Sequence, residues 1–234
     1  MKIIKFFLQY FRFFLFNEYR EKQLSLYVSR EIKNLIKDKK ELKILDFGSG
    51  MNPIVIKLIY SNIISKHNHI KLNIDCYDFY TDKQISILNK ELDNISFYKL
   101  SELNKVSNNY DFALILDVLH YVGINDTEKI SNIINNLSRI SKFIIIKDHF
   151  CNNFFSKIIL IIMDFIGNFY NNVNIPKLYF TEKIYNEILK NNNMLEIKRL
   201  TNYYYYKKYW LFFTNPNLHF ISIFTCEKSN HINK

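Results

Sequence analysis

The sequence predicts an α/β fold, a doubly wound sheet of seven strands that is mostly parallel and lies between two layers of helices. Short apolar runs alternate with amphipathic stretches from residue 42 to residue 190, and such alternation is typical of a parallel sheet with helices on both faces. No helical pattern separates the last two apolar runs, 194–200 and 219–226. We therefore expect them to pair as a long hairpin that makes one strand antiparallel.

Each element follows from the hydrophobic periodicity along the chain. A charged, periodic stretch at 18–40 predicts a helix before the sheet. Pro53 suits the first turn of the next helix, and Thr181 is placed as the N-cap of the last one. The predicted strands are 42–47, 72–77, 95–99, 112–117, 143–147, 194–200 and 219–226, and the predicted helices after the first are 53–65, 82–92, 126–140 and 181–190.

The composition limits the class of protein. With 234 residues and 48% hydrophobic residues, the chain can bury the core of one large domain, which excludes disorder as its main state. Its cysteines, Cys76, Cys151 and Cys226, lie far apart, which argues against a disulfide framework or a zinc site and fits a reducing cytoplasm. No metal ligands are predicted. The net charge of +10 indicates either an anionic partner or a compositional bias toward lysine.

Residues 1–16 form an apolar arm on which Lys5, Gln9 and Arg12 share one helical face. The arm is shorter than the roughly 20 residues that span a bilayer, and no small-residue cleavage site follows it. Two interpretations stay open: peripheral contact with an anionic membrane, or a lid packed on the domain. We divide the chain into a helical arm, 1–40, and a domain, 41–234, with a lid or acceptor-binding insertion at 149–180.

The most informative segment is the glycine turn, Gly48-Ser49-Gly50, which follows an apolar strand ending in Asp46-Phe47. The chain has only four glycines, and two stand here. Glycine lets the chain turn sharply and lets a ligand lie against the backbone, and ligands of open α/β sheets bind at the carboxyl ends of strands. The third glycine of a dinucleotide-binding loop is replaced by Pro53, and an acid before the turn favours a positively charged ligand.

This segment resembles motif I of the class I S-adenosylmethionine-dependent methyltransferases, whose acid and three alternating glycines correspond to Asp46, Gly48, Gly50 and, in place of the third glycine, Asn52. The similarity is greatest to the type 11-like, small-molecule branch. It implies a Rossmann-like fold with a reversed last strand and S-adenosyl-L-methionine as cofactor. It also implies that Asp46 favours the amino-acid end of the cofactor, while the backbone around Ser49 passes its ribose and methionine chain.

The resemblance implies further contacts in chain order. An acid at the end of the second strand binds the ribose hydroxyls, for which Asp78 is the better candidate and Asp75 the reserve. Ser101 and Glu102 follow the third strand, where the family has an adenine contact. The segment 110–122 resembles the family's fourth-strand motif and places Asp117 over the cofactor, although a loop hydrogen bond is an equal alternative.

Three side chains are candidates for catalysis. His149 follows the fifth predicted strand and is the first candidate for a general base, with Asp148 orienting it or binding the acceptor; a surface loop is the alternative. His120, past the fourth strand, is the second candidate base, because an imidazole titrates near neutral pH. Relatives that carry a histidine here without using it as a base leave its role open.

We expect a cytoplasmic methyltransferase that methylates oxygen on a small or lipid-linked hydroxylated acceptor, such as a glycan precursor, with peripheral contact at the inner membrane face. In the insertion, Asp164, Gly167 and Asn168 would bind a polyhydroxyl acceptor or cap a lid helix. A nucleic-acid methyltransferase is disfavoured, because no Asn/Asp-Pro-Pro-aromatic motif follows the fourth strand. A non-catalytic, membrane-associated binding protein that keeps the fold is the other alternative, suggested by Asn52.

Overall fold

The predicted sheet is confirmed. The computed structural model describes residues 18–36, 39–50, 53–65, 69–92, 94–106, 109–122, 127–168, 176, 179–201 and 218–226. Within them, seven strands form one sheet in the order β3-β2-β1-β4-β5-β7-β6. The pairs among β1 to β5 are parallel, whereas β7 runs antiparallel to both β5 and β6. The strands are β1 Glu41–Phe47, β2 Lys71–Asp78, β3 Ile95–Lys99, β4 Tyr110–Leu116, β5 Ser141–His149, β6 Leu195–Thr201 and β7 His219–Thr225.

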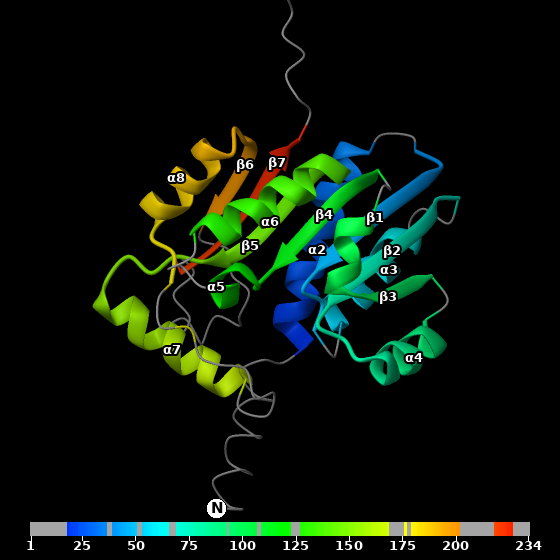
Figure 1. Cartoon of the computed structure of the whole chain (residues 1–234), viewed down its shortest axis with the longest axis horizontal. Coiled ribbons are helices and arrows are strands. Elements are labelled where there is room, and N and C mark those ends of the chain that lie inside the picture. The colour runs from blue at the N-terminus through cyan, green and yellow to red at the C-terminus, as the bar shows by residue number, and fades with distance from the viewer. Residues whose placement is uncertain are drawn as a thin grey trace, which may run out of the picture.

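Helices cover both faces of the sheet, with α6 in front of it and α2 behind it in Figure 1. Alternate strand residues feed two cores: Ile44 packs with the core that includes α2, α3 and α4, whereas its neighbour Leu45 packs with the core that includes α6 and α8. The helices are α2 Glu18–Leu35, α3 Ile54–Ile64, α4 Asp82–Glu91, α5 Leu119–Val122, α6 Thr127–Ile140, α7 Phe154–Asn168 and α8 Glu182–Asn191, with the short 3-10 helix η1 Leu100–Lys105.

Helix starts follow the expected side-chain chemistry. The Thr181 hydroxyl accepts a hydrogen bond of 3.2 Å from the Ile184 N–H, which confirms the predicted N-cap of α8. Thr81 and Gln84 form a capping box at the start of α4. The first helix, predicted to run to residue 40, ends at Leu35, and a turn from the Lys39 N–H to the Ile36 carbonyl redirects the chain into β1.

The difference from the prediction that matters most for the site lies in β5. The strand extends two residues past the predicted end at 147, because Asp148 and His149 pair with Phe220 and His219 of the antiparallel β7. His149 therefore lies inside the sheet and is buried rather than at the rim of a loop. The insertion after it contains α7, which lies beyond the sheet rather than on one of its faces (Figure 1).

Among the described residues, no helix combines the length and the apolar character that crossing a membrane requires. The arm at 1–16 and Asn52 lie outside the described residues, so the predictions made for them stay predictions.

Candidate active site

The glycine turn has the backbone that its sequence predicts. Gly48 and Gly50 both adopt left-handed conformations, with φ values of 81° and 68°. A Cβ on Gly48 would stand 2.6 Å from Val118 Cγ2, so this glycine is needed for both its conformation and its packing. A Cβ on Gly50 would meet no atom of the described residues within 4 Å. The turn therefore packs closely against the end of β4 on one side and leaves open space on the other.

Asp46 is buried directly beneath this turn. Burial raises the pKa of its carboxyl to about 7, opposed by a hydrogen bond from Ser49 and assisted by the charge of Asp78. A cation that approached Asp46 would stabilise the ionised carboxylate and lower this pKa again. The site is thus chemically suited to a positively charged ligand.

The end of β2 is tied to the turn through Asp78. Its carboxylate accepts a hydrogen bond of 2.6 Å from the Gly50 N–H, and the Tyr80 hydroxyl donates to the Gly50 carbonyl at 2.7 Å. Asp46, the turn and Asp78 therefore lie together. Asp75 instead accepts a 2.7 Å hydrogen bond from the Tyr110 hydroxyl inside the sheet. Ser101 is exposed on η1, and no hydrogen bond within the described part of the chain joins it to the turn.

A second group, here called the polar cluster, lies at the carboxyl ends of β4 and β5. Asp117, the first residue after β4, has a φ of 59°, and its carboxylate forms ion pairs with Arg20 of α2 and Lys147 of β5. Burial acts to raise the pKa of Asp117, but Lys147 and Arg20 outweigh it and hold the pKa well below its usual range. The cluster consists of Arg20, Asp117, His120, Lys147, Asp148, His149 and Asp164.

Lys147 and Arg20 were not among the predicted site residues. Lys147 is fully buried, and burial lowers its pKa to about 8 against the opposing effect of Asp117. A lysine directly after the apolar run Ile144–Ile146, inside a strand predicted to be buried, is the signal that could have identified it. Arg20 is one of many charged residues of α2, and nothing in the sequence pattern of this helix identifies it as a site residue.

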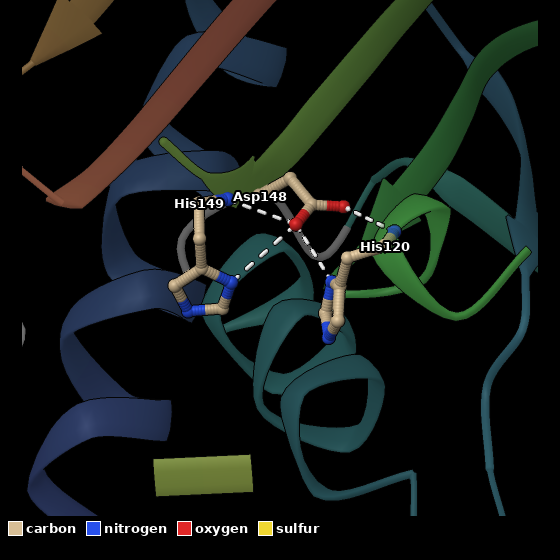
Figure 2. Close-up of side chains that lie close together, drawn as sticks. All are labelled: His120, Asp148 and His149. Carbon is tan, nitrogen blue, oxygen red and sulfur yellow. Dashed lines mark hydrogen bonds and ion pairs between the residues drawn. The ribbon is translucent and has the colours of Figure 1, made fainter. Parts of the chain in front are cut away.

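Figure 2 shows Asp148 between the two histidines, with a ring nitrogen of each directed toward its carboxylate. His120 Nδ1 lies 2.7 Å from Asp148 Oδ1, and the His120 N–H donates to Oδ2 at 3.3 Å. His149 binds the same carboxylate through its backbone N–H at 2.8 Å, while its Nδ1 stands 3.4 Å away. Asp148 and His120 are 0% and 1% exposed, so the hydrogen-bonded pair is shielded from solvent.

The two imidazoles have opposite electrostatic surroundings. Burial lowers the pKa of His120, but Asp148, Asp164 and Asp117 outweigh burial and raise it above the ordinary value of 6.5. Burial and Lys147, whose ammonium nitrogen lies 3.4 Å from His149 Nε2, lower the pKa of His149 despite the opposing effects of Asp117 and Asp148. His149 is therefore the more readily neutral ring, and its Nε2 lone pair faces a cation.

The insertion contributes Asp164, which was singled out in the sequence. Its carboxylate accepts hydrogen bonds from Tyr179 at 2.5 Å and Tyr121 at 3.2 Å, and its Oδ1 lies 3.8 Å from His120 Nε2. The helix α7 thus reaches the same groups that end β4 and β5.

His120, Asp148 and His149 each place a potential ligand atom within 4.8 Å of the others, a spacing short enough for a metal ion. The Asp148 carboxylate, however, already accepts the His120 Nδ1–H and the His149 N–H, and the buried ammonium of Lys147 lies next to His149. This charge and these hydrogen bonds favour a proton network over a cation site.

No protein-family model matches the chain, and no curated protein sequence matches it. Among solved structures, mitomycin 7-O-methyltransferase MmcR is 12% identical, with a TM-score of 0.54 over 86% of this chain and 54% of that one. LepI, solved in complex with SAM, is 11% identical, with a TM-score of 0.55 over 84% of this chain and 46% of that one. This chain spans about half the length of these two proteins.

A cyclopropane-fatty-acyl-phospholipid synthase-like protein from Lactobacillus casei is 12% identical, with a TM-score of 0.55 over 88% of this chain and 90% of that one. At such low identity the three similarities establish a shared fold. The chain therefore has the Rossmann-like α/β fold of these structures, with its reversed last strand.

Proposed function

We propose that this protein is an S-adenosylmethionine-dependent methyltransferase that methylates a hydroxyl group of a small organic acceptor. One observation carries the proposal: the left-handed glycine turn packs, through Gly48 and Val118, against the segment that leads into the buried His120–Asp148 pair. A ligand-binding turn and a potential base thus share the carboxyl edge of the sheet, where α/β proteins bind ligands. The similarity in fold to a mitomycin 7-O-methyltransferase and to LepI with SAM supports it.

The turn fits the cofactor in three respects. The open space beside Gly50 leaves room for a ligand against the backbone. The raised pKa of Asp46 is that of a carboxyl with no cationic partner among the described residues, and the sulfonium and ammonium groups of the cofactor are cations. The Asp78 carboxylate can accept two ribose hydroxyls, and Ser101 is the candidate for the adenine contact. When bound, the cofactor supplies an electrophilic methyl group, so the chain has to align the acceptor.

The amino-acid end of the cofactor carries an ammonium and a carboxylate. The ion pair between Arg20 and Asp117 offers a group of opposite charge to each of them. A carboxylate has about four lone-pair sites, so Asp117 can accept an ammonium beside Arg20 and Lys147. We assign the cofactor's ammonium to Asp117 and Asp46, and its carboxylate to Arg20. The N-terminal helix α2 would then close over the amino-acid end of the cofactor.

His120 is the side chain best placed to act as a general base. Asp148 accepts its Nδ1–H, which directs the lone pair of Nε2 away from Asp148 and toward α7. The acceptor hydroxyl would give its proton to Nε2 as its oxygen bonds to the methyl carbon and the S–CH₃ bond breaks, with the electron pair left on sulfur. Asp148 would stabilise the resulting imidazolium. Since His149 directs Nε2 at the Lys147 ammonium, we assign it a positioning role for Lys147 and Asp117.

The acceptor is proposed to be small or lipid-linked. The outer face of α7 exposes large apolar side chains, including Phe154, Phe155 and Ile162, which supports contact with an apolar acceptor chain or a membrane surface near the site. The free cysteines Cys76, Cys151 and Cys226 support a cytoplasmic location.

Two measurements test the proposal. Calorimetry should detect binding of S-adenosylmethionine and of its demethylated product, and no heat at millimolar ligand would exclude the cofactor. Transfer of a radiolabelled methyl group is then measured on a panel of phenols, catechols and glycosides. His120→Ala should lower the rate by roughly 100-fold or more at unchanged cofactor affinity, within the usual range for a general base. The matched control is His69→Ala, an exposed histidine before β2.

A further inference from the structure

The imidazole of His120 has a carboxylate on each side. Asp148 holds Nδ1 at 2.7 Å, and Asp164 Oδ1 lies 3.8 Å from Nε2. Only two residues of α7 are charged, Lys157 and Asp164, so the apolar helix contributes its sole carboxylate to the polar cluster. Hydrogen bonds from Tyr121 and Tyr179 fix that carboxylate in place, which makes its approach to His120 a built arrangement rather than a chance contact.

The Nε2 atom of His120 is buried and has no hydrogen-bond partner within the described residues. A separation of 3.8 Å is too long for a direct hydrogen bond but short enough for strong electrostatic attraction to a protonated ring. If the ring is neutral, two acceptor atoms face each other across this gap. The arrangement is therefore more favourable when a proton is on Nε2, or when a hydroxyl group donates to one of the two atoms.

We propose that Asp164 is a positioning residue that strengthens His120 as a base by stabilising its protonated ring from the Nε2 side. The role of His120 as base rests on the function proposed above, whereas the effect of Asp164 on its protonation does not. During transfer, the acceptor O–H proton would move to Nε2 while its oxygen bonds to the methyl carbon. The S–CH₃ bond of the sulfonium would break, and the sulfur would keep that electron pair as a neutral thioether. The imidazolium between Asp148 and Asp164 would later release the proton to solvent. The insertion thus contributes to the chemistry.

Other charged and titratable groups also face His120. Asp117 acts in the same direction as Asp164, and His149 lies with its ring centre 5.2 Å away. Tyr121 and Tyr179 contact the ring from α5 and from the segment before α8. Among these groups, Asp164 alone comes from α7, so changing it leaves the strand-end network in place.

Histidine titration by NMR, without cofactor or acceptor, tests the proposal directly. His120, assigned by the signals lost in His120→Ala, should titrate above 6.5 in the wild type, and Asp164→Asn should lower its pKa by about 1, a tenfold loss of proton affinity. A wild-type value at or below 6.5, or an equal pKa in both proteins, overturns it. If the variant does not fold, a wild-type value at or below 6.5 still overturns the proposal.

Two controls separate charge from structure. Tyr179→Phe removes a hydrogen bond to Asp164 but keeps the carboxylate, so the pKa of His120 should remain above 6.5. Asp82→Asn removes an exposed carboxylate that pairs with Lys99 and should leave His120 unchanged. With an active acceptor, Asp164→Asn should also move the rising limb of the pH–rate profile to lower pH and reduce the maximal rate. Because the titration needs no cofactor, its failure is distinguishable from failure of methyl transfer.

Discussion

The glycine turn and the polar cluster meet at one edge of the sheet but are built differently. The turn consists of consecutive residues whose backbone conformation defines it, with φ values of 81° and 68° at Gly48 and Gly50. The cluster depends on side chains that come from α2, the ends of β4 and β5, and α7, and are up to 144 positions apart, from Arg20 to Asp164. We therefore expect the turn to be sensitive to side-chain size, and the cluster to charge.

The largest effect is expected from removing charge inside the cluster. Asp117→Asn keeps a side chain that tolerates the φ of 59°, but it leaves the buried Lys147 without its carboxylate. Breaking a buried ion pair by removing one partner costs roughly 3–5 kcal/mol, so the free energy of unfolding, measured in urea, should fall by about 3 kcal/mol.

The control for this prediction is the double variant Asp117→Asn with Lys147→Met. Replacing both charges also removes the buried ammonium that has lost its ion pair with Asp117, so the double variant should be more stable than Asp117→Asn alone. The single variant Lys147→Met completes the comparison. If the double variant loses as much stability as the two single variants added together, the two charges are not coupled, and the cluster is not an ionic unit.

A smaller loss of stability is expected from adding a side chain to the glycine turn. Gly48→Ala places a Cβ 2.6 Å from Val118 Cγ2 and forces alanine into a left-handed conformation. Conformational strain costs about 1–2 kcal/mol, and overpacking should add about 1 kcal/mol, the low end of its usual range, because Val118 is only partly buried. Together they should lower the free energy of unfolding by about 2–3 kcal/mol. Gly50→Ala has the strain without the contact and should cost about 1–2 kcal/mol. Adding Val118→Ala should relieve part of the Gly48→Ala loss, and no relief would contradict the packing explanation.

The third prediction concerns binding rather than stability. Gly50→Arg fills the open space beside the turn, so calorimetry should show an S-adenosylmethionine affinity lower by roughly 100-fold or more, about 2.7 kcal/mol. Its stability should match that of Gly50→Ala, since both share the conformational strain. Equal affinity of the arginine and alanine variants would show that the cofactor lies elsewhere.

The same contrast explains how much the sequence predicts. Alternating apolar runs predict the sheet and its reversed last strand, because periodicity is a local signal. Asp46, the glycine turn and Asp78 follow from strand ends, since consecutive parallel strands bring their carboxyl ends to one edge. Asp148 and His149 were predicted as site residues, but they were not predicted to be buried. Their burial depends on the pairing of β5 with β7, which is distant in sequence.

The partners within the cluster depend on tertiary approach alone. Arg20 meets Asp117 across 97 positions, and periodicity in α2 gives no information about which of its charges turns inward. Asp164 stood out only as a polar residue on an apolar helix, and its contact with His120 depends on where α7 packs.

The smallest effect is expected in the pH dependence of cofactor binding. It tests whether the charge of Asp46 contributes to binding at the turn. The pKa of Asp46 is raised to about 7, so its carboxyl is mostly protonated at pH 6 and mostly ionised at pH 8. If a cationic cofactor requires the ionised form, the affinity of the wild type should rise about tenfold between these pH values, in proportion to the ionised fraction.

Asp46→Asn separates this titration from that of the cofactor's own amino group, because the variant keeps the cofactor and loses only the carboxyl. The ratio of wild-type to variant affinity should therefore increase with pH through 7, whereas any contribution from the cofactor cancels. The folded protein should show the opposite trend without ligand: a carboxyl whose pKa is raised by folding binds protons more tightly in the native state, so wild-type stability should fall between about pH 4 and pH 7, relative to the variant. Parallel pH profiles of the two proteins would mean that Asp46 is already neutralised by a partner, and the turn would then recognise its ligand by backbone and shape alone.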